Sequence, residues 1–211
     1  RSYLVVLLVS IGLVSVLLAV ENTVDSFPEA LRVSAFQVIS VATTTGYSSA
    51  NYALWPAFAP VLLVFLGCFV SCAGSTGGGI KMVRMILLVK QAKRELVRAI
   101  HPRVVNPVHL GGTAISNAVL MSVMAFMLIY GATIITLTMV LLYTGMDMVS
   151  AFTAVVATVN NIGPGLGNVG PAANYGSLTD FQTWVCTVAM MLGRLELLSV
   201  LVLFTAQFWR K

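Results

Sequence analysis

Long apolar segments separated by short polar stretches dominate the chain. Residues 3–20 form an uncharged run of 18 residues, and residues 110–146 form one of 37. Because a membrane-spanning helix needs about 20 predominantly apolar residues, we predict spanning helices over residues 2–20 and 113–143. Hydrophobic residues make up 58% of the sequence and charged residues 9%, whereas soluble domains carry about 25% charged residues. We therefore predict an all-α integral membrane protein.

Two further helices are predicted to be too short to cross a membrane. The first covers residues 28–41 and follows Ser26 and Glu29, whose spacing is typical of a capping box at a helix start. The second covers residues 148–159. Helices of this length extend only about 20 Å, so each must enter the membrane and stop inside it. Irregular backbone is tolerated there only where it is buried in protein or lines water, which predicts two re-entrant hairpins around a pore.

The turn after the first short helix has the composition of a potassium filter. It consists of Thr43, Thr44, Thr45, Gly46, Tyr47 and Ser48. Thr supplies a hydroxyl and a carbonyl oxygen, and Gly allows the backbone twist that points successive carbonyls at an ion. We therefore predict that residues 43–47 form a filter strand, with K⁺ bound at Thr44 and Thr45.

The turn after the second short helix repeats this design 117 residues later. It consists of Asn160, Asn161, Ile162, Gly163, Pro164 and Gly165. We predict that residues 160–163 form a second filter strand, with K⁺ bound at Asn161 and Ile162. Pro164 replaces Tyr47, so the two strands differ, and we expect weaker discrimination of K⁺ from Na⁺ than in a pore of identical strands. Neither strand carries a carboxylate, which argues against selection by rings of charged side chains.

A glycine-rich segment interrupts the helix predicted between residues 56 and 100. It consists of Gly74, Ser75, Thr76, Gly77, Gly78 and Gly79. Each interior glycine costs a helix about 1 kcal/mol relative to alanine, so a break is expected. A phosphate-binding loop is excluded because Lys81 lies one position late and Met82 replaces the required Ser or Thr. We predict an intramembrane gate, held by the five donors of an inward-pointing Arg194.

The net charge of +5 is concentrated in one place. Seven of the twelve basic residues fall between Lys81 and Arg103, and such a cluster marks a cytoplasmic segment. The same rule places the N-terminus and Arg210 in the cytoplasm, so both hairpins enter from outside. Little soluble surface remains, which argues against nucleic-acid binding. Topology and contacts with membrane lipid phosphates account for the cluster, and docking of a cytosolic regulator is a further possibility.

The domain organisation is predicted as two copies of one unit. Residues 1–100 form a helix–pore-helix–helix repeat with a broken second helix, residues 101–112 a cytoplasmic linker, and residues 113–211 the second repeat, which a helix over residues 179–208 closes. The three cysteines and two histidines have no disulfide or metal-ligand spacing. No nucleophile–base pair is present in the sequence, so we predict no enzyme.

Together these motifs resemble the TrkH/KtrB superfamily of potassium transporters, and most closely its TrkH members. The resemblance rests on the two filter turns, on residues 71–81 and on residues 193–196, and it covers essentially the whole chain. That superfamily has four helix–hairpin–helix repeats around one pore, and this chain resembles the last two. It lacks a signal-peptide pattern and begins at Arg1, so we expect a fragment of a longer protein, with pairing of two chains as the alternative.

The resemblance implies potassium uptake by a multi-pass protein of the bacterial inner membrane. It also implies filter glycines at Gly46 and Gly163, a gate at residues 74–79 approached by Arg194, homodimerisation, and a cytosolic nucleotide-binding regulatory subunit. Any nucleotide would bind that partner, because this chain has no site for one.

We therefore predict the pore subunit of a Trk-type system, half of a four-repeat potassium-channel-like pore. The alternative is an alternating-access carrier of monovalent cations, a symporter coupled to H⁺ or Na⁺, because broken helices and repeats also occur in secondary transporters. Single-channel currents would distinguish a pore from a carrier.

Overall fold

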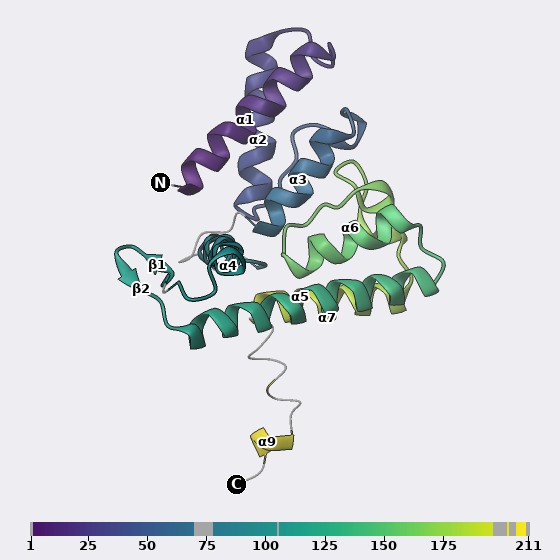
Figure 1. Cartoon of the computed structure of the whole chain (residues 1–211). Helices are drawn as coiled ribbons and strands as arrows, with labels where there is room; N and C mark the ends of the chain where they lie inside the picture. Colours follow the sequence, from purple (N-terminus) through teal and green to yellow (C-terminus); the bar gives the residue numbers. More distant parts are fainter. Residues whose placement is uncertain (1, 70–77, 105, 196–201, 203–205, 210–211) are drawn as a thin grey trace.

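The computed structural model (Figure 1) describes residues 2–69, 78–104, 106–195, 202 and 206–209. The α-helices are α1 (Ser2–Val20), α2 (Phe27–Ala42), α3 (Phe58–Phe69), α4 (Met82–Ile100), α5 (Asn117–Tyr143), α6 (Met148–Val159), α7 (Asp180–Arg194) and α9 (Ala206–Trp209). The 3-10 helices are η1 (Tyr52–Leu54), η2 (Gly167–Val169) and η3 (Tyr175–Ser177), and the strands are β1 (His109–Leu110) and β2 (Thr113–Ala114). The predicted helical fold class is confirmed. The structure adds one short β-hairpin, with two residues in each strand.

Two helices in the described part of the chain are long and apolar enough to cross a membrane, and they are α1 and α5. The shorter apolar helices are α3 and α6. Large apolar side chains lie on the outer surfaces of both long helices, for example Leu8, which is 68% exposed, and Leu128, which is 75% exposed. Such surfaces are stable against lipid and costly in water, which fits the membrane class of fold.

Local hydrogen bonding shifts one predicted boundary. The helix expected from residue 113 begins at Asn117, because Thr113 pairs with Leu110 in the hairpin. The Ser116 hydroxyl then accepts the Val119 N–H at 3.5 Å and caps α5. At the other end of the chain, α7 ends at Arg194, and most of the remaining predicted helix lies outside the described residues.

The capping box expected at the start of α2 is wrong in its hydrogen bonds. Ser26 occupies the N-cap position, but its side chain forms no capping hydrogen bond. Glu29 instead pairs with Arg32 at 3.6 Å, one helical turn further on. A complete capping box is found at α7, between Thr179 and Gln182.

The described core has two main clusters of buried residues. α1, α2 and α3 pack around residues such as Val14, Val38 and Leu63. α5, α6 and α7 pack around a second set that includes Leu141 and Val155, and α5 and α7 lie side by side in Figure 1. These clusters define two helical units, the first made of α1, α2 and α3 and the second of α5, α6 and α7, and the two units contact each other where α3 meets α6.

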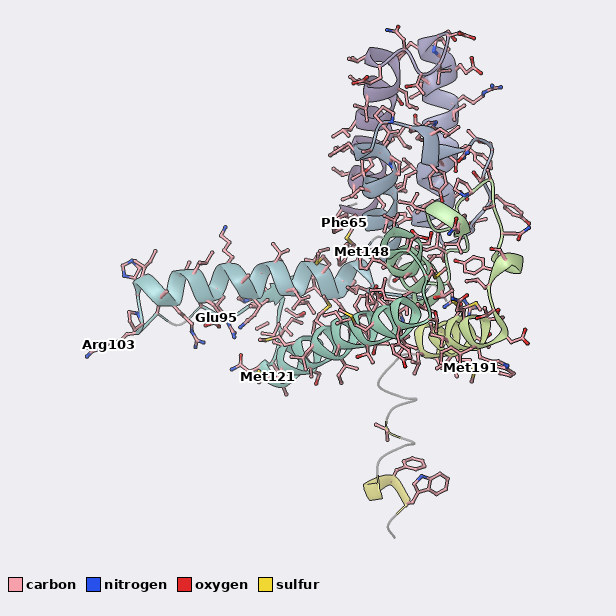
Figure 2. All side chains as sticks on the ribbon, turned by 90° about the vertical axis from the view of Figure 1, so that its right-hand side faces the viewer. Phe65, Glu95, Arg103, Met121, Met148 and Met191 are labelled. Carbon is pink, nitrogen blue, oxygen red and sulfur yellow. The ribbon has the colours of Figure 1, made fainter. Side chains whose placement is uncertain are left out.

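The helix α4 carries the basic segment away from the first unit (Figure 2). Its Arg84 guanidinium lies 4.1 Å from the centre of the Phe126 ring, and Arg94 donates to Asn117 Oδ1 at 3.0 Å. α4 thus packs along the first half of α5, with Arg103 following its far end.

Candidate functional site

The turns after α2 and α6 have the same backbone conformation. Thr43 ends α2 with φ −87° and ψ 2°, and Asn160 ends α6 with φ −87° and ψ −4°. The next residues, Thr44 and Asn161, are left-handed, with φ 55° and 54°. Two positions later, each turn has a glycine with positive φ, 80° in the first turn and 107° in the second. One backbone design is therefore present twice, in the register that the sequence indicates.

Each turn is closed by the same pair of hydrogen bonds. In the first, the N–H groups of Thr44 and Thr45 donate to the carbonyls of Val41 and Ser40, at 3.0 and 2.9 Å. In the second, the N–H groups of Asn161 and Ile162 donate to the carbonyls of Thr158 and Ala157, at 3.1 and 2.9 Å. This is the Schellman pattern of a helix end, in which the left-handed residue is usually glycine.

A left-handed threonine is strained, because a β-branched side chain disfavours positive φ. The left-handed conformation costs an L-residue roughly 1–2 kcal/mol, and asparagine tolerates it better than threonine does. Such strain persists where the surrounding structure enforces it, and it is concentrated at functional sites. Thr44 is therefore a strained position in the first turn and a candidate functional residue.

The main-chain oxygens of both turns remain available. Among the described residues, no protein donor bonds the carbonyls of Thr43, Thr44, Thr45, Gly46, Asn160, Asn161 or Ile162. The carbonyls that follow are bonded: Tyr47 O accepts from the Ser40 hydroxyl at 2.6 Å, and Gly163 O accepts from the Tyr175 hydroxyl at 2.9 Å. Each turn thus offers a short series of carbonyl oxygens between anchored ends.

The two turns touch each other. Gly46 lies so close to the Ile162 main-chain oxygen that a Cβ there would overlap it. The Ile162 side chain, only 4% exposed, sits against Gly67 of α3 and Val41 of α2, where a side chain at position 67 would overlap its Cδ1 atom. Tyr52 adds a long hydrogen bond from its hydroxyl to Gly165 O, at 3.5 Å. The second turn is thereby seated in the first unit.

The predicted filter residues differ widely in how exposed they are. Tyr47 is 73% exposed, whereas Asn160 is completely buried. Asn160 accepts a hydrogen bond from the Tyr130 hydroxyl at 2.9 Å and donates to Val156 O at 2.7 Å. Asn160 can therefore face an ion only through its main chain.

Four residues that the sequence did not single out hold these turns. They are Ser40, Tyr52, Tyr130 and Tyr175. Each of these residues has a hydroxyl group within an apolar or loop segment. That hydroxyl was the only feature of the sequence that could have indicated a hydrogen bond to the turns. Their partners lie elsewhere in the chain, so the sequence pattern alone did not identify them.

The predicted gate is only partly described. Gly74, Ser75, Thr76 and Gly77 lie outside the described residues. Gly78 is buried and Gly79 has φ 78°, and both pack directly against Asn160. Arg194 is the last residue of α7, and its side chain is exposed among the described residues. The gate remains a prediction from sequence.

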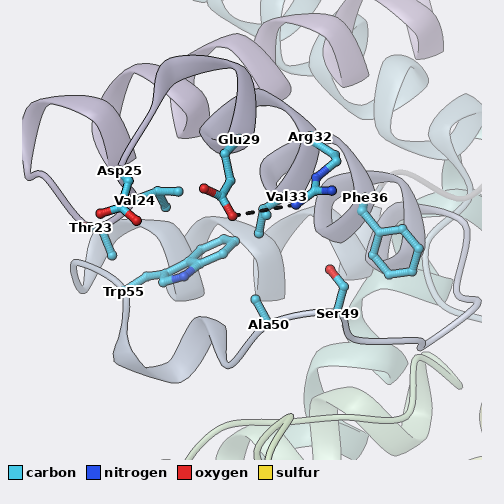
Figure 3. Close-up of a pocket in the computed structure, with 10 residues that line it drawn as sticks. All are labelled: Thr23, Val24, Asp25, Glu29, Arg32, Val33, Phe36, Ser49, Ala50 and Trp55. Carbon is cyan, nitrogen blue, oxygen red and sulfur yellow. Dashed lines mark ion pairs between the residues drawn. The ribbon is translucent and has the colours of Figure 1, made fainter.

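A cavity of about 660 Å³ lies beside the N-terminal half of α2 (Figure 3). Asp25 and Glu29 line it together with Arg32, which pairs with Glu29 at 3.6 Å. Trp55 and Phe36 supply apolar walls. Its charged groups therefore lie near the start of α2, at the opposite end of this helix from the turn.

A second cavity, of about 320 Å³, lies between α6 and α7 and is called here the α6/α7 groove. Residues lining it include Thr158, Ile162, Tyr175, Cys186, Thr187 and Met190. The corresponding space in the first unit, where α2 and α3 meet α6 and the second turn, has a volume of only about 10 Å³. Tyr52 and Tyr175 occupy matching places, since each opens a 3-10 helix that an asparagine side chain caps. The second unit thus has an open groove at the place where the Ile162 side chain fills the first unit.

Comparison with known proteins places these features in a family. The family described as "TrkH: Cation transport protein" matches residues 2–211. The Trk system potassium uptake protein TrkH of Vibrio parahaemolyticus is 45% identical over 186 residues, which are 88% of this chain and 37% of that protein. The TrkH of Salmonella typhimurium is 42% identical over 211 residues, which are 100% of this chain and 43% of that protein.

More distant relatives and a solved structure agree with this placement. The Trk system potassium uptake protein TrkG of Escherichia coli is 38% identical over 84% of this chain and 36% of its own length. The crystal structure of the potassium transporter TrkH from Vibrio parahaemolyticus superimposes with a TM-score of 0.93 at 40% identity, covering 100% of this chain and 44% of that one. The chain thus spans less than half the length of the relatives it matches. It belongs to the TrkH family of cation transport proteins.

Proposed function

We propose that this chain forms half of a potassium-selective pore that takes up K⁺. Residues 43–47 and 160–163 are the filter strands, and K⁺ is held by oxygens of Thr44, Thr45, Asn161 and Ile162. The observation that carries the proposal is the duplicated left-handed turn at the ends of two short helices. The relatives are named potassium uptake proteins.

Helix orientation supports a cation at this place. The C-terminal ends of α2 and α6 lead directly into the turns, and a helix C-terminus carries about half a negative charge. Carbonyl oxygens to which none of the described residues donates can replace the water shell of a monovalent ion. The two strands differ at Tyr47 and Pro164, so we expect weaker discrimination against Na⁺ than in a pore of four identical strands.

The surfaces of the two units support assembly into a ring. Thr45 is the residue of the first turn that corresponds to Ile162, and it is exposed. The α6/α7 groove corresponds to the space in the first unit that the Ile162 side chain fills. One edge of the chain therefore offers a protruding residue and the other an open groove. Such head-to-tail interfaces close into rings when the rotation permits, so further repeats complete the pore. We favour repeats from the same longer polypeptide over two copies of this chain.

The remaining parts of the proposal concern topology and partners. We place the protein in a bacterial inner membrane with the Lys81–Arg103 segment and both chain ends in the cytoplasm, because basic residues cluster there. We also propose a homodimer and a cytosolic nucleotide-binding subunit, both of which are implied by the resemblance to the TrkH/KtrB superfamily. The alternative function is an alternating-access carrier coupled to H⁺ or Na⁺.

Flux through liposomes tests the proposal. The full-length parent and this chain alone are reconstituted separately, and K⁺ and Na⁺ uptake are measured for wild type and for Gly46→Ser and Gly163→Ser. Gly111→Ser is the matched control, because Gly111 also has positive φ but lies in the β-hairpin with open space around it. We expect K⁺-favouring flux from the parent, altered by both filter changes and unaffected by the control.

Three outcomes count against parts of the proposal. Flux without K⁺ preference in the parent rejects the filter assignment. Selective flux from this chain alone shows that its own copies complete the ring. Transport without single-channel currents under any condition favours the carrier.

A further inference from the structure

Asn160 occupies a position where four segments of the chain meet. It ends the pore helix α6 and directly precedes the left-handed Asn161. Its side chain is completely buried, and its neighbours come from α3, from the start of the α4 segment and from α5. The first residue of the second filter strand is therefore held from inside the protein.

The hydrogen bonds of the Asn160 amide fix its orientation. Its Oδ1 atom accepts from the Tyr130 hydroxyl at 2.9 Å. Its Nδ2 group donates to Val156 O at 2.7 Å and lies 3.6 Å from Cys68 Sγ. Because a carboxamide oxygen only accepts, the tyrosine hydroxyl must be the donor. Tyr130 is itself only 5% exposed. Its hydroxyl thus holds the Asn160 amide through a hydrogen bond that comes from the long helix α5.

Two glycines complete the enclosure. A Cβ at Gly79 would overlap Asn160 Oδ1, and one at Gly78 would lie 2.8 Å from Asn160 O. The adjacent Ile80 N–H donates to Cys68 O at 3.1 Å, so this segment is tied to the end of α3. The Asn160 side chain is therefore enclosed by the two glycines and held by the hydrogen bonds of its amide.

The first turn lacks an equivalent restraint. Thr43, which corresponds to Asn160, is exposed. Its hydroxyl bonds Ile39 O at 2.7 Å and Thr45 Oγ1 at 2.8 Å, both within its own segment. Among the described residues, only the second turn is anchored to a different membrane-spanning helix at its first position.

We propose that Tyr130 is a positioning residue for ion discrimination, acting through Asn160 on the second filter strand. The inference rests on the proposed filter function. The hydroxyl holds the amide, the amide holds the end of α6, and the end of α6 sets the path of Asn161 and Ile162. Removing the hydroxyl leaves the buried Oδ1 without its bond and releases the strand to shift away from the geometry that favours K⁺.

The test compares Tyr130→Phe with wild type in the full-length parent, measuring K⁺ and Na⁺ uptake into the same liposomes. The expected result is a fall of at least about threefold in the K⁺/Na⁺ ratio, since a lost buried bond shifts equilibria by this order or more. Tyr143→Phe is the control, because it removes the same hydroxyl from the last residue of the same helix, where Tyr143 is 94% exposed. Its ratio should match wild type.

The ratio separates positioning from a general loss of structure. A variant that merely folds less well lowers uptake of both ions together, and the ratio does not depend on how much protein is inserted. Asn160→Ala supplies the second arm. If Tyr130 acts through Asn160, Tyr130→Phe should lower the ratio no further in the Asn160→Ala background.

Two results would overturn the inference. One is an unchanged K⁺/Na⁺ ratio in Tyr130→Phe, and the other is a further drop when both changes are combined. A wild-type parent without K⁺ preference would overturn the proposed function itself, so the two failures are distinguishable.

Discussion

The Cα atom of Gly46 faces the main-chain oxygen of Ile162 at a separation that leaves no space for a side chain at position 46. Gly163 is less confined, because a Cβ there would lie 3.8 Å from Gly46 Cα and 4.0 Å from Gly46 O, which are ordinary van der Waals contacts. Both glycines have positive φ. The two corresponding positions therefore differ in how strictly they require glycine.

We predict that Gly46→Ala is more damaging than Gly163→Ala. Both changes place an alanine at positive φ, which costs roughly 1–2 kcal/mol, but only the first forces Ile162 to move. The K⁺/Na⁺ uptake ratio of the parent should fall further for Gly46→Ala, together with the thermal unfolding temperature in detergent. Equal effects of the two changes would show that the contact with Ile162 is unimportant.

A second prediction concerns the contact between α6 and α7. A Cβ at Gly193 would overlap Val159 O, so Gly193→Ala must push the two helices apart at the C-terminal end of α6. Gly131 lies within α5 and has nothing within 4 Å of its Cβ position. Gly131→Ala should therefore stabilise the protein by up to about 1 kcal/mol through helix propensity.

Thermal unfolding of the two variants in the same detergent checks this contrast. We expect a lower unfolding temperature for Gly193→Ala and an equal or higher one for Gly131→Ala. A Gly193→Ala protein as stable as wild type would mean that α7 can shift without cost.

These contacts indicate which features the sequence could predict. Helix length and the positions of glycine and proline are local properties, and they located α2, α6 and both turns. The boundary of α5 was missed because the pairing of Thr113 with Leu110 competes with an apolar pattern that continues through it. The capping box at Ser26 was wrong because Glu29 pairs with Arg32 instead.

The tertiary contacts of the site could not be obtained in this way. A tyrosine in an apolar helix gives the same pattern whether it faces lipid or protein, so Tyr130 gave no sign of its bond to Asn160. Ile162 was predicted only as a source of a carbonyl oxygen. Its side chain also joins the two units by filling the space beside Gly67.

A third prediction concerns the N-cap of α6. The Ser150 N–H donates to the Asp147 carboxylate at 2.9 Å, and this bond holds the pKa of Asp147 below its ordinary value. A group whose pKa is lowered on folding stabilises the folded state above its unfolded pKa, near 4, and the contribution is lost as the pH falls through the folded value. Asp147→Ala should cost about 1 kcal/mol at pH 7.

Unfolding temperatures of wild type and Asp147→Ala, measured from pH 7 down to pH 3, check this prediction. The difference between the two proteins should be constant above about pH 5 and shrink as the pH falls below about 4. Asp147→Asn retains a capping side chain and should show no such titration. A difference that grows on acidification would contradict the assignment.

The last prediction concerns charge in the cavity beside α2 that Figure 3 shows. Arg32 partly neutralises Glu29, with which it pairs at 3.6 Å, while Asp25 lies in the same lining. Arg32→Gln makes this cavity more negative and should raise the local K⁺ concentration, increasing K⁺ uptake at low salt by about twofold. Glu29→Gln should lower uptake under the same conditions, because it removes a negative charge and leaves Arg32.

Ionic strength distinguishes this effect from a change in structure. The screening length falls from about 30 Å at 0.01 M salt to about 8 Å at 0.15 M, so both effects should diminish when an impermeant salt is added at constant K⁺. Lys93→Gln removes a positive charge of the same size from α4, far along the chain from this cavity, and serves as the control. An Arg32→Gln increase that persists at high salt would mean that the change acts through packing of α2, since a screened field could not produce it.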